Sequence, residues 1–77
     1  MTRNEFLREL EGQMEIAPGS LNGDQVLSEV EGWDSLAAVM FIALADEKVG
    51  ATVSGNQIAN AKTINDLLSL LGNKLTN

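Results

Sequence analysis

Apolar residues at the start of the chain recur at the spacing of an α-helix. Phe6, Leu7, Leu10 and Met14 follow this spacing, and arginine and glutamate residues stand between them. Side chains placed in this way share one face of a helix. The pattern predicts an amphipathic helix from Thr2 to about Met14, with its apolar face packed against the rest of the protein.

The chain from Ile16 to Gly32 lacks this periodicity and is interpreted as a long connection. It contains the only proline of the sequence and several other residues typical of turns: Pro18, Gly19, Ser20, Asn22 and Gly23. A loop of this length in a small domain is either functional or held down by its own side chains. We expect four apolar residues to hold it against the core: Leu21, Val26, Leu27 and Val30.

The most apolar stretch is Val39–Ala45, inside a segment expected to form a helix from Ser35 to about Lys48. Gly50 is well placed to end this helix as its C-terminal cap. Seven successive apolar positions cover every direction around the axis, so part of this surface must face water or a partner. We assign one side to the core, namely Ile42, Ala45 and Val49. We assign a neighbouring strip to a partner face, namely Ala37, Met40 and Leu44.

Two pairs of residues later in the chain have the spacing of helix capping boxes. Ser54 with Gln57 predicts a short third helix, and Thr63 with Asp66 predicts a last helix. The apolar residues of these helices are Ile58 and Ala61 in the third and Ile64, Leu67, Leu68 and Leu71 in the last. Their spacing gives the last helix an apolar face for the core.

Together these elements predict one all-α domain spanning residues 1–77. We expect a small four-helix bundle of three longer helices and one short third helix, with a long loop between helices one and two. Gly72 should end the last helix, and residues 73–77 should form a frayed tail. A chain of 77 residues buries only about 60% of the surface that it exposes when unfolded, so it has a single modest core.

Ser35 is the residue with the clearest candidate chemistry. Asp34 is a good N-cap for the second helix, and Gly32 is a turn residue just before it. Ser35 then lies on the first turn, beside unpaired N–H groups and the positive end of the helix dipole. An anion carried covalently on its hydroxyl is favoured there. A phosphate ester fits this position.

The composition excludes several classes of metal site and enzyme active site. The chain has no cysteine and no histidine, so the usual zinc ligands, a thiol nucleophile and the usual general base are missing. Ser35 as a catalytic nucleophile would need Asp34, Asp46, Glu47 or a lysine as its base, and none stands in a recognisable triad pattern. We therefore expect a protein that is not an enzyme.

Charge is distributed unevenly along the chain. Residues 1–34 hold eight acidic and two basic side chains, and residues 35–77 hold three of each, so the net charge of −6 lies upstream of Ser35. Such a protein is expected to bind partners with basic surfaces and not nucleic acid. The chain has no apolar stretch of membrane-spanning length and no signal-peptide pattern, so we expect a cytoplasmic protein without membrane contact.

Asp34-Ser35-Leu36 at the head of an apolar helix resembles the motif of the acyl carrier proteins. The resemblance continues through Gly50, Val53-Ser54 and Thr63-Ile64, without a gap from Asp34 to Leu71, and it covers almost the whole chain. It implies that a phosphopantetheinyl transferase attaches 4′-phosphopantetheine from coenzyme A to Ser35. The terminal thiol would then hold cargo as a thioester for loading, condensing, tailoring or releasing enzymes.

The resemblance also implies a cleft between the second and third helices that can receive an acyl chain. Its candidate lining residues in this sequence are Phe41, Ile42, Ile58, Ala59 and Leu67. Phe41 and Ile42 are bulky, so we do not expect a deep pocket for long chains. Trp33 is expected to pin the end of the preceding loop, and a lid over the prosthetic arm or a contact for partners is the alternative role.

The chain departs from fatty-acid synthesis carriers on the second helix. The second and fifth positions after the serine are commonly acidic in those relatives, whereas here they are Ala37 and Met40. Our hypothesis is that docking along this helix is more apolar, and that the loop acids supply the electrostatic attraction. These acids are Asp24, Glu29, Glu31 and Asp34. The candidate partner surface is Glu29, Glu31, Ala37, Met40, Leu44, Asp46 and Glu47.

The cargo is left open by the sequence. An acyl group of fatty-acid, polyketide or related specialised biosynthesis is the first interpretation, because an aspartate precedes the serine. An aminoacyl or peptidyl group of a non-ribosomal pathway is an alternative. A further alternative is a helical adaptor that carries no prosthetic group and docks through the second helix. In each case we expect a monomer.

Overall fold

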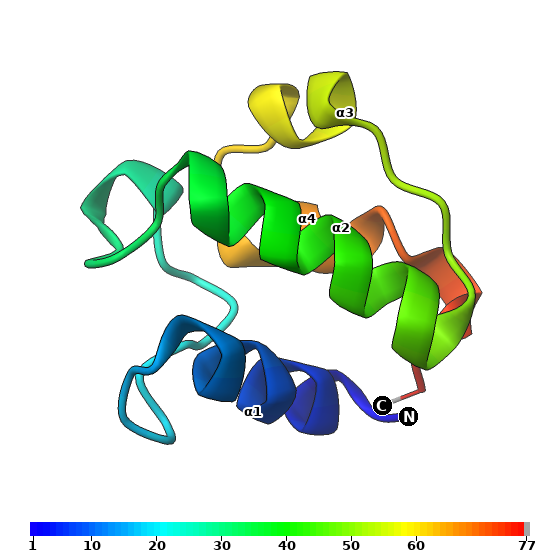
Figure 1. The fold of residues 1–77 in the computed structure, drawn as a ribbon, viewed down its shortest axis with the longest axis horizontal. Helices are drawn as coiled ribbons and strands as arrows, with labels where there is room; N and C mark the ends of the chain where they lie inside the picture. The colour runs from blue at the N-terminus through cyan, green and yellow to red at the C-terminus, as the bar shows by residue number, and fades with distance from the viewer. Residues whose placement is uncertain (77) are drawn as a thin grey trace.

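The computed structural model describes residues 1–76, and within them all regular structure is helical. Four α-helices follow one another: α1 (Arg3–Met14), α2 (Ser35–Val49), α3 (Gly55–Asn60) and α4 (Ile64–Ser69). Two short 3₁₀ turns, η1 (Leu27–Glu29) and η2 (Gly72–Lys74), lie before α2 and after α4. The predicted all-α four-helix fold is confirmed, including the long loop between the first two α-helices (Figure 1).

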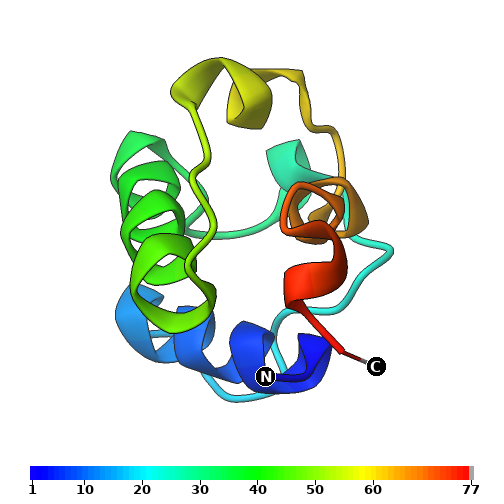
Figure 2. The same ribbon diagram turned by 90° about the vertical axis from the view of Figure 1, so that its right-hand side faces the viewer.

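The helices surround a single core. Figure 2 shows α2 and α4 on opposite sides of the molecule, with α1 below them and α3 above. Phe6 of α1 and Phe41 of α2 are fully buried, and their rings meet edge to face with centroids 5.5 Å apart. Such a pair contributes about 0.5–1.5 kcal/mol beyond the burial of its area. This contact sets how α1 and α2 pack together.

The helix starts are fixed by the local sequence, as predicted. Ser54 with Gln57 and Thr63 with Asp66 each form a complete capping box, at the first turns of α3 and α4. Helix α2 ends at Gly50, which adopts a left-handed conformation with φ of 67°. That conformation is one that glycine adopts without strain, so Gly50 acts as the predicted cap.

The last helix is shorter than predicted. α4 contains six residues, the same number as α3, so the bundle has two longer and two short helices. After Ser69 the backbone bonds shift to the tighter spacing of a 3₁₀ turn, with Leu70 donating to Leu67 and Leu71 donating to Leu68. The chain therefore keeps coiling to Lys74 without continuing the α-helix.

The C-terminal segment is paired with the N-terminus, in contrast to the frayed tail expected for residues 73–77. Thr76 donates its backbone N–H to Met1 at 2.9 Å, and the Arg3 N–H donates to Thr76 at 3.0 Å. Leu75, the residue between the 3₁₀ turn and Thr76, packs against the core. These backbone bonds join residues about seventy positions apart, so local sequence gave no signal of them. Asn77 lies outside the described residues.

Buried side chains and backbone hydrogen bonds hold the long loop against the rest of the protein. Leu21 and Leu27 are buried as predicted, and Val30 is half-buried. Val26 differs, because its side chain is 44% exposed and only its backbone is tied, through a bridge to Thr63. Leu27 also donates its N–H to Lys62 at 2.8 Å. The loop therefore runs along the link between α3 and α4 before it enters α2.

A buried carboxylate holds the first part of the loop. Glu11 is only 1% exposed, and it accepts hydrogen bonds from the backbone N–H groups of Gly19 at 3.0 Å and Leu21 at 2.7 Å. Arg8, one turn earlier on α1, donates to both of its oxygens and also to the Leu21 carbonyl. Burial by itself raises the pKa of Glu11, but these hydrogen bonds outweigh it and hold the pKa below its ordinary value.

Candidate functional site

Ser35 is the first residue of α2 and is exposed to solvent. Asp34 precedes it as the N-cap, and its side-chain Oδ1 accepts a hydrogen bond from the Ala37 N–H at 2.9 Å. Gly32 adopts a left-handed conformation with φ of 88°, which turns the loop just before the helix. The predicted placement of Ser35 on the first turn is confirmed by this geometry.

The backbone around Ser35 favours a negative charge. Asp34 already satisfies the N–H of Ala37 through its side chain and that of Ala38 through its carbonyl. The N–H groups of Ser35 and Leu36, in the same first turn, have no acceptor within the helix because of helix geometry. Together with the dipole of a 15-residue helix, they stabilise an adjacent anion by about 0.3–1 kcal/mol. A phosphodiester on the Ser35 hydroxyl fits this environment.

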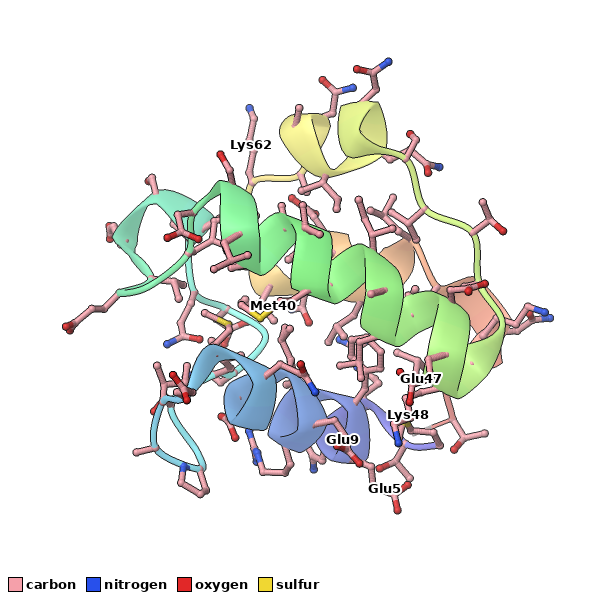
Figure 3. The ribbon with its side chains drawn as sticks, in the orientation of Figure 1. Glu5, Glu9, Met40, Glu47, Lys48 and Lys62 are labelled. Atoms are coloured by element: carbon pink, nitrogen blue, oxygen red, sulfur yellow. The ribbon has the colours of Figure 1, made fainter. Side chains whose placement is uncertain are left out.

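The surface beside Ser35 is apolar. Leu36 is 64% exposed and Val39 is 60% exposed, although both are large hydrophobic residues. Met40 and Ala43 continue the same side of α2, with Met40 half-buried on the side that faces α1 (Figure 3). We call Leu36, Val39, Met40 and Ala43 the outer strip of α2. No residue from Ser35 to Ala45 is charged.

The outer strip corrects the orientation that the sequence analysis gave to α2. Ala37 and Leu44 were assigned to the partner surface, but they are 0% and 3% exposed and belong to the core. Phe41 and Ala45 are buried with them, so the core face follows Ala37, Phe41, Leu44 and Ala45. Ile42 and Val49, assigned to the core, are only half-buried. Ala45 alone of that predicted core side is fully buried.

The remaining candidate partner residues are exposed but lie in separate places. Glu29 is in η1 and Glu31 follows it, both upstream of Ser35. Asp46 and Glu47 are exposed near the other end of α2. Figure 3 shows Glu47 beside Lys48, whose ammonium lies 3.9 Å from the Glu9 carboxylate of α1. An exposed ion pair of this kind contributes little to stability.

Three of the five candidate cleft residues are buried in this structure, and none of the five lines a cavity that we describe. Phe41, Ile58 and Leu67 are at most 7% exposed and form part of the packed core. Ile42 is half-buried against the same core, and Ala59 is exposed on α3. The three cavities that we describe for residues 1–76 have other linings. Phe41, Ile58 and Leu67 therefore act as packing residues in this conformation.

Trp33 is half-buried and packs against the core. Its backbone N–H donates to Val30 at 3.2 Å, which closes a turn just before α2. This arrangement agrees with the predicted role of pinning the end of the loop. The alternative role, as a lid or partner contact, stays a prediction.

Two features of the site region were not found from the sequence. The first is the Glu11 network, whose signal is visible in retrospect, because Glu11 stands one helical turn after Leu7 on the core face of α1. The second is a cavity of about 480 Å³ between the first half of the loop and the segment Glu29–Gly32. A cavity formed by a loop has no periodic signature in sequence, so no pattern could have revealed it.

Comparison with known families shows which family the chain belongs to. The family model described as the phosphopantetheine attachment site matches residues 4–71, a range that includes the helix start at Ser35 and all four α-helices except one residue. The chain belongs to this family. Its members carry covalently attached 4′-phosphopantetheine, and they act as carriers that do not catalyse reactions themselves. This confirms the resemblance noted above.

Members of the phosphopantetheine-attachment family interact with phosphopantetheinyl transferases and with biosynthetic enzymes. No curated protein and no solved structure gives a significant match to the chain. No helix among residues 1–76 is long and apolar enough to cross a membrane. In the same described part of the chain, no group of acidic side chains is arranged to hold a metal ion.

Proposed function

We propose that Ser35 is the attachment residue for 4′-phosphopantetheine and that the protein carries an acyl group as a thioester on it. The observation that carries this proposal is the position of Ser35, exposed on the first turn of α2, with Asp34 as N-cap and unpaired N–H groups beside it. Membership of the family indicates which prosthetic group is attached. The local geometry supplies one hydroxyl in a suitable electrostatic environment.

The attachment reaction balances with coenzyme A as the donor. The Ser35 hydroxyl oxygen forms a bond to the phosphorus that bears the pantetheine arm, and the bond from that phosphorus to the bridging oxygen of the diphosphate breaks. Adenosine 3′,5′-bisphosphate leaves, and the hydroxyl proton passes to a base of the transferase. The flexible arm then keeps the cargo at high local concentration around each docked enzyme.

In this proposal the protein presents the cargo to partner enzymes and does not catalyse a reaction itself. Helix α2 offers an apolar outer strip next to Ser35, which a partner enzyme can cover. The cargo that we propose is an acyl group of fatty-acid, polyketide or related biosynthesis. The packed state of Phe41 and Leu67 favours presentation of that group outside the bundle over storage of a long chain within it. We further propose that the carrier is cytoplasmic and monomeric.

The proposal is tested by incubating the protein with coenzyme A and a broad-specificity phosphopantetheinyl transferase and measuring intact mass. The wild type should gain one phosphopantetheinyl group, and Ser35→Ala should gain none. Ser28→Ala is the matched control, because Ser28 is an exposed serine in the loop just before α2. Equal gain by Ser35→Ala and Ser28→Ala would contradict the assignment of Ser35.

A second assay distinguishes the kinds of carrier and the adaptor. Acyl-coenzyme A and aminoacyl-coenzyme A donors, used with the same transferase, give loaded proteins that can be offered to condensing enzymes of each pathway class. Acyl transfer without aminoacyl transfer supports the proposed cargo. No mass gain by folded wild-type protein with several transferases would instead favour the adaptor, with the outer strip as its docking face.

A further inference from the structure

The turn at Asn22-Gly23 holds the middle of the long loop against α4. The Gly23 carbonyl accepts a hydrogen bond from the Asn65 N–H at 2.9 Å, and the Gln25 carbonyl accepts from the Ile64 N–H at 3.0 Å. Ile64 and Asn65 are the first two residues of α4, so their N–H groups have no acceptor within the helix. The backbone of the loop therefore supplies these acceptors.

The close contact between the loop and α4 requires glycine at position 23. A Cβ atom on this residue would overlap the side-chain amide of Asn65. Asn65 is itself held in place, because its Oδ1 accepts a hydrogen bond from the guanidinium of Arg3. The packing therefore leaves the peptide nitrogen that follows Asn22 without the steric cover that a side chain on residue 23 would give.

The side chain of Asn22 is folded back toward the same peptide bond. Its Oδ1 accepts a hydrogen bond from the Asp24 N–H at 3.2 Å, which is a common way for asparagine to form a turn. Gln25 braces this turn, because its side chain accepts from the Asn22 N–H at 2.7 Å and donates to the Ser20 carbonyl at 2.7 Å. An ordered turn thus keeps the amide carbon of Asn22 close to the backbone nitrogen of Gly23.

The backbone nitrogen of Gly23 is available to react with this amide. Within residues 1–76 we find no hydrogen bond in which the Gly23 N–H is the donor, and Asn22 is exposed to solvent. The Asp24 N–H would stabilise the negative charge that develops on Oδ1 when a nucleophile attacks the amide carbon. A nucleophile that is held beside its electrophile reacts much faster than one that must meet it by diffusion.

We propose that Asn22 is a site of spontaneous deamidation, through which the protein modifies its own loop. The Gly23 nitrogen forms a bond to the amide carbon of Asn22, the bond from that carbon to Nδ2 breaks, and ammonia leaves with the proton of the Gly23 N–H. Water then opens either side of the cyclic imide and gives aspartate or isoaspartate at position 22. The reaction needs only water, so the inference does not depend on attachment of a group at Ser35.

Formation of isoaspartate should release the loop from α4. The main chain gains a methylene group before Gly23, and a carboxylate is added to a protein whose net charge is already −6. The Gly23 carbonyl can then no longer meet the Asn65 N–H, because the Asn65 amide leaves no room for the backbone to shift toward it. An N–H at the start of α4 loses its partner, which favours opening of the loop.

The test is incubation of the folded protein at mildly alkaline pH, followed by tandem mass spectrometry that distinguishes aspartate from isoaspartate. Asn22 should be converted at least about tenfold faster than Asn56, which is also exposed but is followed by Gln57. Labelling by an isoaspartyl methyltransferase detects the isoaspartate product independently. Asn22→Ser should give no product at this position, although its hydroxyl can still accept the Asp24 N–H.

The purified isoaspartate form shows whether the loop has been released. Its Tm should fall by about 5–15 °C, because one or two hydrogen bonds to α4 are lost in a small domain. Limited proteolysis should cut it within residues 16–26 faster than the unmodified protein. Asn22→Asp is the matched control, since it adds the same charge without lengthening the main chain, and its Tm should stay within about 3 °C of the wild type.

The possible outcomes separate the steps of this inference. If Asn22 stays intact in the folded protein, the turn protects the amide and the inference fails. Equal conversion of Asn22 and Asn56 would show that the turn does not promote the reaction, which also overturns it. If isoaspartate forms but its Tm matches that of Asn22→Asp, the release of the loop from α4 is wrong. Phosphopantetheinylation of Ser35 is measured separately, and none of these results changes that proposal.

Discussion

The side-chain Oδ1 of Asp34 lies 2.9 Å from the backbone nitrogen of Ala37, and this hydrogen bond spans Ser35 at the start of α2. It satisfies one of the orphan N–H groups of the first turn. It also fixes the backbone from which the Ser35 side chain projects. The residue before the serine is therefore a structural cap, whatever contacts its carboxylate makes with an enzyme.

The first prediction concerns this cap. Asp34→Ala should lower the free energy of unfolding by about 1 kcal/mol, whereas Asp34→Asn should change it by only a few tenths, because asparagine caps about as well as aspartate. For a domain of this size the loss corresponds to a fall in Tm of about 4–8 °C. Urea unfolding of the unmodified proteins measures the free energy of unfolding, and thermal unfolding measures the Tm. Equal destabilisation by the two substitutions would show that the charge, and not the cap, is what matters.

The second prediction concerns the two sides of α2. Leu44→Ala should destabilise the protein by about 2–5 kcal/mol, because Leu44 is buried and leaves a cavity. Val39→Ala should cost no more than about 0.5 kcal/mol, because Val39 is 60% exposed. Val39→Ala should nevertheless slow transfer from the loaded carrier to a condensing enzyme. A large stability loss for Val39→Ala with a small one for Leu44→Ala would reverse the assignment of the two faces.

The contrast between these two residues shows what the sequence could and could not predict about α2. Its start at Ser35 and its end at Gly50 were predictable, because caps are local signals. Its rotation was not, since a run of seven apolar residues has almost no preferred direction around the axis. Contacts from α1, above all that of Phe6 with Phe41, decide which side is buried.

The third prediction concerns the buried carboxylate of Glu11. Glu11→Ala should destabilise the protein by about 2–3 kcal/mol, because the N–H groups of Gly19 and Leu21 lose their acceptor inside the protein. Arg8→Ala should cost less, because the Arg8 side chain is 42% exposed and those two N–H groups keep their bonds. Urea unfolding at neutral pH measures both changes. A larger loss for Arg8→Ala than for Glu11→Ala would contradict this account of the loop.

The fourth prediction concerns pH. The pKa of Glu11 is lower in the folded protein than its ordinary value of 4.5. The unfolded chain therefore binds more protons, and the stability contributed by Glu11 is fully present above pH 4.5 and is lost as the pH falls through the lower, folded pKa. The pKa values of Glu5 and Asp66 are lowered too, because Glu5 accepts a hydrogen bond from the Thr2 N–H and Asp66 accepts from the N–H groups of Lys62 and Thr63. The difference between wild type and Glu11→Gln isolates the share of Glu11.

This pH difference is measured by urea unfolding between neutral pH and about pH 3. The wild type should lose more stability than Glu11→Gln over that range, because glutamine has no proton to gain. Parallel losses in the two proteins would show that Glu11 contributes nothing to the acid sensitivity.

The Glu11 network and the loop cavity mark the limit of sequence reasoning for this site. The position of Glu11 on the core face of α1 could have suggested a buried carboxylate, but its partners Gly19 and Leu21 lie eight and ten residues away in an irregular loop. The exposure of Leu36 and the pairing of Thr76 with Met1 likewise depend on how distant parts of the chain meet. Ser35, the proposed attachment residue, needed no such information, because its signal is a cap followed by an apolar helix.

The measurement that tests the central claim most directly is the position of the prosthetic group after reaction with coenzyme A and a transferase. The modified protein is digested, and tandem mass spectrometry locates the added group within the peptide that contains Trp33 to Val39. The account predicts one phosphopantetheinyl group, on Ser35, in a protein that keeps its helical spectrum. A group found on Ser28 or another serine, or no group on the folded protein, would contradict it.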